Sequence, residues 1–176
     1  MKFSTIFPLA LTFTAAALIV TASACSVVSN VQITFYGYPD NSPPGADIAY
    51  DCGRGTSASG TGTYADPLTM ATATGEYATC EIVYLPYLEK YLIYEDECEQ
   101  CVTDWSSGIA HIDVWTGSST VNGGQTQIDC ENSLTPNSNQ GVLRQPGPDL
   151  TVDSTALFDS GTCNTADTYP NNNAGC

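Results

Sequence analysis

The sequence His111-Ile112-Asp113-Val114-Trp115-Thr116-Gly117 decides the fold, because it sets an aspartate in the middle of an apolar, β-branched segment. β-Branched residues favour strands, and side chains alternate between the two faces of a strand. His111, Asp113 and Trp115 are therefore expected on one face. A carboxylate between an imidazole and an indole is a candidate catalytic acid, because partial burial raises its pKa. The alternative is an exposed strand face on which Asp113 has only a structural role.

Short β-type segments separated by glycine, proline and asparagine run through the rest of the chain. They are residues 31–38, 48–52, 67–71, 81–85, 91–95 and 126–130, with weaker ones at 142–145 and 150–152. Residues 121–125 predict a turn. Pro86 would interrupt a helix, so two strands are preferred to the helix suggested by the spacing of Tyr84, Tyr87, Tyr91 and Tyr94. Many short strands with Gly/Pro turns predict an all-β fold, either a small barrel or a sandwich.

The first 24 residues have the pattern of a secretory signal peptide. Lys2 gives a positive start, residues 6–20 are apolar, and Ala22-Ser23-Ala24 fits a cleavage site. The apolar run is short for a membrane span, which needs about 20 residues. We therefore expect a secreted, extracellular protein that does not associate with membranes.

The cysteines support an oxidising compartment. The chain has eight of them, and every one lies at position 25 or later. An even number behind a signal peptide predicts four disulfides, although eight cysteines allow 105 pairings and the sequence does not choose among them. The polar tail between Cys163 and Cys176 has one large apolar residue, Tyr169, so disulfides are expected to hold it in place. On this view, loss of Cys176 would loosen the tail and leave the barrel's melting temperature nearly unchanged.

The charge balance excludes several classes of partner. Nineteen acidic residues against four basic ones give a formal net charge of −15. Nucleic acid requires a basic surface, so nucleic-acid binding is not expected. A strongly acidic chain suits an extracellular medium and neutral polymers. The length fits one domain, which we expect to be monomeric.

Three short motifs resemble a known superfamily of secreted, fungal-type proteins. Thr34-Phe35-Tyr36-Gly37 is similar to the opening strand of expansins. His111-Ile112-Asp113, after Ile93-Tyr94-Glu95-Asp96, is similar to the His-Phe-Asp region of expansins and family 45 endoglucanases. Asp96 and the run from Ile112 to Gly117 also resemble the RlpA-like and lytic-transglycosylase 3D domains. The resemblance covers residues 31–130 and implies a six-stranded double-psi β-barrel with disulfide-pinned loops and an irregular C-terminal tail. The expected organisation is a signal peptide (1–24), the barrel (25–130) and a C-terminal extension packed on it (131–176).

The resemblance also implies roles for individual residues. Asp113 matches the catalytic general acid, and Asp96 matches a second acidic position. Family 45 hydrolases carry their base four residues after the threonine of the first strand, where this chain has Tyr38; Asp40 lies two residues further on. An inverting hydrolase needs two carboxylates with room for water between them. His111 is expected to orient the site.

We therefore expect a polysaccharide-acting protein, with a glycoside hydrolase or lytic transglycosylase-like enzyme as the leading possibility. Asp113 would act as acid, with Asp96 or Asp40 as base or stabiliser. The expected substrate-binding residues are Trp105, Trp115, Tyr36 and Asp104. The alternatives are a non-catalytic expansin-like wall-loosening or carbohydrate-binding protein, and a small secreted effector or inhibitor.

Other kinds of site are weakly supported. No Gly-x-Ser-x-Gly sequence occurs and there is one histidine, which disfavours a serine hydrolase. Cys98-x-x-Cys101 lacks enough further ligands for zinc, and no βαβ pattern surrounds it to suggest a redox site. Asp47, Asp51 and Asp66 could bind calcium, but their spacing does not match an EF-hand. No metal or cofactor is therefore expected.

Overall fold

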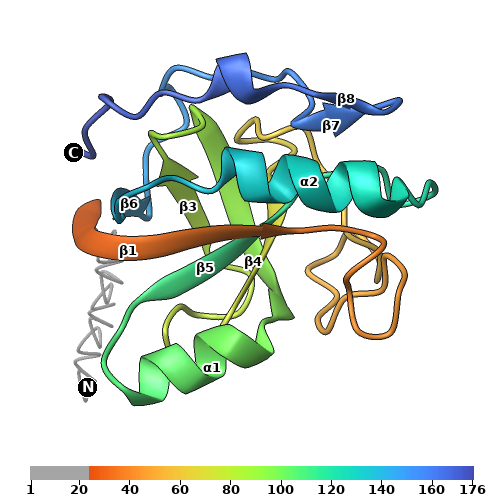
Figure 1. Ribbon diagram of the computed structural model, residues 1–176. Helices are drawn as coiled ribbons and strands as arrows, with labels where there is room; N and C mark the ends of the chain where they lie inside the picture. The colour runs from red at the N-terminus through yellow and green to blue at the C-terminus, as the bar shows by residue number, and fades with distance from the viewer. Residues whose placement is uncertain (1–23) are drawn as a thin grey trace, which may run out of the picture.

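A computed structural model describes residues 24–176 as a mostly β fold with two helices (Figure 1). The expected signal peptide therefore lies outside the described residues, apart from Ala24. The strands and helices are β1 (Ser26–Tyr36), β2 (Leu68–Thr72), β3 (Ile82–Leu85), β4 (Lys90–Glu97), α1 (Glu99–Ser106), β5 (His111–Trp115), α2 (Gly124–Leu134), β6 (Gln140–Arg144), β7 (Phe158–Asp159) and β8 (Thr162–Cys163), followed by a 3-10 turn (Thr165–Asp167).

Six strands form a closed barrel in the order β1-β5-β2-β4-β3-β6. Two neighbouring pairs, β1–β5 and β2–β4, are parallel, and the other four pairings are antiparallel. This mixed pairing confirms the predicted six-stranded double-psi β-barrel. Closure removes the unpaired strand edges that an open sheet would expose to other chains.

β-Branched and other apolar side chains fill the barrel, as the strand patterns predict. Val31, Ile33, Met70, Ile112 and Val114 are at most 2% exposed and belong to one core cluster. The tyrosines of β3, β4 and the turn between them are packing residues too, because Tyr84, Tyr87, Tyr91 and Tyr94 are all at most 6% exposed. Residues 86–89 form the turn between these two strands, so the two-strand interpretation of this segment is confirmed.

Helix α2 replaces a predicted turn and strand. Residues 126–130 belong to this helix, which Figure 1 shows lying along β1 with the β7–β8 pair above it. Its buried positions are Gln127, Cys130, Glu131 and Leu134, which follow helical spacing. Two of those four residues are polar, so the sequence shows no apolar stripe, and the strand prediction there is wrong.

The other helix, α1, was not predicted from the sequence either. It is eight residues long, packs against β5 and β2, and buries only Cys101. Cys98 caps its N-terminus, with Sγ accepting from the Cys101 backbone N–H at 3.0 Å. None of the helices in the described part of the chain is long and apolar enough to cross a membrane.

All eight cysteines are paired, which confirms the four predicted disulfides. The pairs are Cys25–Cys176, Cys52–Cys80, Cys98–Cys101 and Cys130–Cys163. Cys163 ties the tail to α2, and Cys176 ties its end to the chain just before β1. Disulfides of this kind persist in oxidising compartments such as the extracellular space.

The C-terminal half of the chain is more closely built into the barrel than the sequence indicates. β6, which lies beyond the expected boundary at residue 130, is the sixth strand and pairs with both β1 and β3. Residues 150–152 form no strand. The segment after them crosses the barrel instead, with the Asp153 N–H donating to Glu89 O at 3.0 Å and the Phe158 N–H to Thr116 O at 3.1 Å.

Candidate active site

Asp113 lies in the middle of β5, between a hydroxyl on one neighbouring strand and an alanine on the other. It pairs with Thr34 of β1 and with Ala71 of β2. The Thr34 hydroxyl donates to Asp113 Oδ1 at 2.7 Å. The side chain of Asp113 is held by this contact yet remains partly exposed to solvent, so it can meet a ligand.

A chain of hydrogen bonds links Asp113 to α1. Thr34 Oγ1 lies 2.8 Å from His111 Nε2, and His111 Nδ1 lies 2.8 Å from Asp104 Oδ2. The threonine has one hydroxyl proton, so when that proton is donated to Asp113, Nε2 is the donor to Thr34. His111 is 2% exposed, so it positions Thr34 and does not contact a substrate.

Asp96 is fixed by its neighbours. Its partner across the sheet is Ala71, the same residue that Asp113 faces, which puts the two aspartate Cα atoms roughly 9–10 Å apart, at two strand spacings. Tyr36 Oη donates to Asp96 Oδ2 at 2.9 Å, and the backbone N–H groups of Ala49 and Glu97 donate to Oδ1 at 3.1 and 2.9 Å. A carboxylate that is 7% exposed and accepts three hydrogen bonds is poorly placed to take a proton from water.

Asp40 is the more accessible second carboxylate. It lies in the turn after β1 and is exposed to solvent. The Gly37 N–H donates to Asp40 Oδ1 at 2.9 Å, and the Asn41 N–H donates to Gly37 O at 3.0 Å. These two bonds fix the turn, so Asp40 is held in place although it is exposed.

The electrostatics of the site favour a protonated Asp113. Burial raises the pKa of Asp113 from 3.8 to about 7; the Thr34 hydrogen bond opposes this shift, and the charges of Asp40 and Asp96 add to it. The pKa of Asp96 is also raised by burial, against the Tyr36 hydrogen bond. A carboxyl group that keeps its proton near neutral pH can act as a general acid.

Two of the expected sugar-binding aromatic residues are buried. Trp115 is 0% exposed and donates from Nε1 to Gly117 O at 2.6 Å. Tyr36 is 7% exposed and meets Trp115 edge to face, with ring centroids 5.2 Å apart. Neither ring is accessible for stacking on a sugar, because both belong to the buried core cluster. Trp105 on α1 is 41% exposed and is free to stack on a ligand.

Asp104 also has a different role from the one expected. Its side chain is 16% exposed and contacts His111 and Gln100. It therefore orients the histidine from α1. Among His111, Asp113 and Trp115, which were expected on one face of β5, Asp113 alone reaches solvent.

The site contains residues that the sequence did not single out. Thr34 lies within a motif that was recognised, but its contact with Asp113 depends on the register of β1 and β5. Glu131 of α2 accepts from Thr116 Oγ1 at 2.9 Å, and Gln127 Nε2 donates to the same hydroxyl at 3.3 Å. Polar residues in the buried stripe of a helix are the signal that could have identified them, had the helix been predicted.

The candidate metal ligands are largely engaged elsewhere. Cys98, Cys101 and His111 cluster within 4.8 Å, but the two sulfurs are bonded to each other and are not thiolates. Asp51 Oδ1 accepts three backbone N–H groups, and Asp66 pairs with Arg54 at 3.3 Å. These sulfurs and carboxylates are therefore occupied by other partners.

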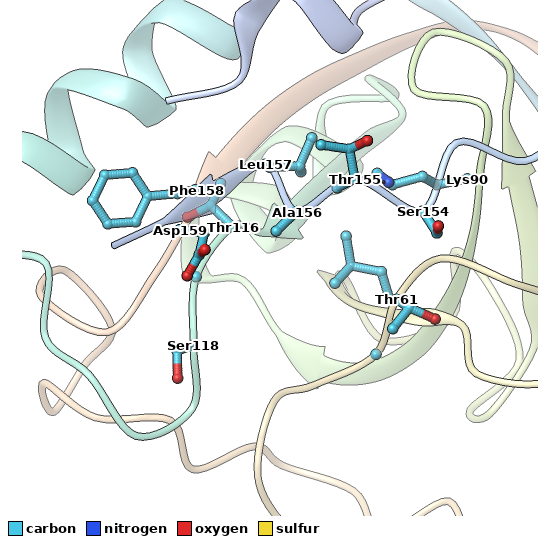
Figure 2. Close-up of a pocket in the computed structure, with 13 residues that line it drawn as sticks. Thr61, Lys90, Thr116, Ser118, Ser154, Thr155, Ala156, Leu157, Phe158 and Asp159 are labelled. Carbon is cyan, nitrogen blue, oxygen red and sulfur yellow. Dashed lines mark hydrogen bonds between the residues drawn. The ribbon is translucent and has the colours of Figure 1, made fainter. Parts of the chain in front are cut away.

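A separate cavity of about 160 Å³ lies between the barrel and the C-terminal segment (Figure 2). Figure 2 shows Lys90 reaching toward Thr155 on one side of it. Lys90 is 1% exposed, and its ammonium group donates to Thr155 O at 2.8 Å and to Asp153 O. Burial lowers the pKa of this lysine. The Lys90 ammonium group thus holds the C-terminal segment to the barrel through the backbone carbonyls of Asp153 and Thr155. Asp113 does not line this cavity.

Comparison with known proteins identifies the family of the chain. The family model described as DDB_G0273701 N-terminal domain matches residues 28–164. The chain is 40% identical over 153 residues to the uncharacterized protein DDB_G0273701/DDB_G0273221 of Dictyostelium discoideum, an alignment that covers 86% of this chain and 66% of that protein. The chain thus spans just under two thirds of that relative. No solved structure matches it. The match across the whole barrel shows that the chain belongs to the DDB_G0273701 N-terminal domain family.

Proposed function

We propose that the protein is a secreted enzyme that cleaves a cell-wall polysaccharide, with Asp113 as the general acid. The observation that carries this proposal is the state of Asp113, a partly exposed carboxyl on a rigid strand whose pKa is raised to about 7. General acid catalysis of this kind contributes about 10²–10⁴ in rate. The His-x-Asp motif and the opening strand of the barrel, which resemble expansins and family 45 endoglucanases, point to a glycan as the substrate.

The proposed reaction is hydrolysis with two carboxyl groups. Asp113 gives its proton to the glycosidic oxygen as the bond to the anomeric carbon breaks. Asp40 is exposed and lies close enough that its charge raises the pKa of Asp113. It takes a proton from the attacking water. Asp96 is committed to Tyr36 and to the backbone, which favours Asp40 for this step.

The other residues position these two groups. Thr34 orients the Asp113 carboxyl, and the Asp104–His111 pair holds Thr34. Trp105 offers an exposed indole for stacking on a sugar. The net charge of −15 favours a neutral glycan such as a glucan over an anionic polymer.

The test is incubation of the purified protein with cellulose, soluble glucans, chitin and peptidoglycan, followed by mass and NMR analysis of soluble products. We expect new reducing ends from one of these polymers, released with inversion at the anomeric carbon. Anhydro products would instead indicate lytic transglycosylase chemistry. Binding without any product would support the alternative, a non-catalytic wall-loosening or carbohydrate-binding protein.

A further inference from the structure

A further carboxyl group, Glu131, lies behind Asp40 and takes no part in the proposed reaction. It projects from the buried face of α2 and is 3% exposed. Its Oε1 accepts from the Thr116 hydroxyl at 2.9 Å, whereas its Oε2 is buried without a hydrogen-bond partner among the described residues. A buried carboxylate oxygen left unpaired is costly, and a proton on that oxygen removes its charge.

Glycine at position 37 brings this carboxyl group up to the turn that carries Asp40. A Cβ at Gly37 would lie 2.5 Å from Glu131 Oε1 and 1.9 Å from Gln127 Nε2. Only a residue without a side chain lets α2 approach so closely. The same Gly37 donates its N–H to Asp40, so Asp40 and Glu131 both lie against this one residue.

The charges of the two groups are coupled. Burial raises the pKa of Glu131 from 4.5 to about 8, and the charge of Asp40 and a hydrogen bond between the two side chains are the next largest causes. Two adjacent carboxyl groups cannot both ionise cheaply, so one of them holds a proton. The buried Glu131 is the protonated member, because burial disfavours its charged form, whereas Asp40 is exposed to water.

We propose that Glu131 is a positioning residue for Asp40: it carries a proton on Oε2 and donates it in a hydrogen bond to the Asp40 carboxylate. The bond holds the Asp40 carboxylate in one orientation, which a base in a solvent-exposed turn requires. During hydrolysis the oxygen of water bonds to the anomeric carbon, Asp40 takes the proton of that water, and Asp113 supplies the proton of the leaving group. Glu131 keeps its proton throughout, and solvent resets the other two carboxyl groups. The orientation of Asp40 for catalysis rests on the proposed function, whereas the hydrogen bond between Glu131 and Asp40 is independent of it.

The first test needs no substrate. Carboxyl ¹³C NMR titration of the intact, disulfide-bonded protein should show Glu131 titrating near pH 8, and Asp40→Asn should lower that midpoint, because the neighbouring charge is removed. Asp129→Asn is the matched control, since Asp129 is an exposed residue of the same helix, and it should leave the Glu131 midpoint in place. A midpoint near 4.5, or one that Asp40→Asn does not move, would overturn the pairing whether or not any glycan is cleaved.

The second test uses the cleaved glycan once it is known. Glu131→Ala should lower kcat by about tenfold with little change in KM, and should move the acidic limb of the pH profile to higher pH. Glu131→Gln, whose amide can still donate to Asp40, should recover most of the loss. A purely structural role would lower the melting temperature and leave the acidic limb where it is, and that result would refute the positioning role.

Discussion

Asp113 combines a strand position, a single hydroxyl donor and two neighbouring carboxylates, and this combination sets its proton affinity. The sequence identified the residue correctly as a strand aspartate beside His111. It could not identify Thr34 as the donor, because that contact depends on how two strands 79 residues apart are aligned. The sequence also assigned Trp115 to an exposed sugar-binding surface, although this residue is buried. Alternation along a strand predicts which side chains share a face, but it does not predict whether the rest of the chain covers that face.

The raised pKa of Asp113 predicts a pH-dependent stability. Between about pH 4 and 7 the folded protein holds a proton that the unfolded chain has lost, so this residue makes folding less favourable as pH rises through that window. Asp113→Asn removes the effect. Relative to wild type, the variant should gain up to about 3–4 kcal/mol of unfolding free energy between pH 4 and pH 8, at about 1.4 kcal/mol per pH unit.

Guanidinium unfolding of both proteins across this pH range measures the difference. Asp129→Asn, which changes an exposed residue of α2, serves as the control and should track wild type. A constant difference between Asp113→Asn and wild type would show that Asp113 titrates alike in the folded and unfolded chains.

At the scale of elements, the strands could be predicted and the helices could not. β3, β4 and β5 follow from alternation and β-branched residues, and their bounds agree with the expected segments to within two residues. β1 begins five residues before the expected segment 31–38, and residues 48–52 form no strand. Helix α2 carries Gln127 and Glu131 at buried positions, so it has no apolar stripe to detect. Those polar residues are buried because they contact Thr116 and the turn after β1, which only the folded chain brings together.

The close approach of α2 to β1 makes Gly37 sensitive to substitution. In Gly37→Ala the added methyl group would overlap Gln127 and Glu131, so α2 must shift. We expect a loss of about 1–3 kcal/mol in unfolding free energy, as is typical of overpacking. Gly147→Ala is the control, because its Cβ would meet nothing within 4 Å. Equal stability of the two variants by thermal or denaturant unfolding would contradict the packing described for α2.

At the scale of the whole molecule, the disulfides close the chain on itself. Cys25–Cys176 joins residues 151 positions apart and links the start of β1 to the end of the tail. The tail also packs, since the Tyr169 N–H donates to Tyr87 O at 2.7 Å and its hydroxyl donates to Asp153 at 2.8 Å. The sequence predicted that disulfides hold the tail, but it could not show that one of them encloses the entire barrel.

This enclosure changes the expected effect of removing the bond. A disulfide that closes so long a loop restricts the unfolded chain strongly, so Cys176→Ser should cost about 2–5 kcal/mol and lower the melting temperature of the barrel as a whole. The sequence alone predicted a different result, in which the tail loosens and the melting temperature of the barrel stays nearly unchanged. Calorimetry of the variant, with Cys25 also replaced to avoid a free thiol, decides between them.

The central claim is that Asp113 supplies the proton for glycan cleavage, and the most direct measurement is the cleavage rate of Asp113→Asn on the polymer that wild type degrades. The asparagine keeps the shape of the side chain but has no acidic proton, so we expect at least about a 100-fold loss of kcat. Circular dichroism of the variant and the activity of Asp129→Asn, which should match wild type, control for folding. A correctly folded Asp113→Asn protein that cleaves the glycan at the wild-type rate would contradict the account.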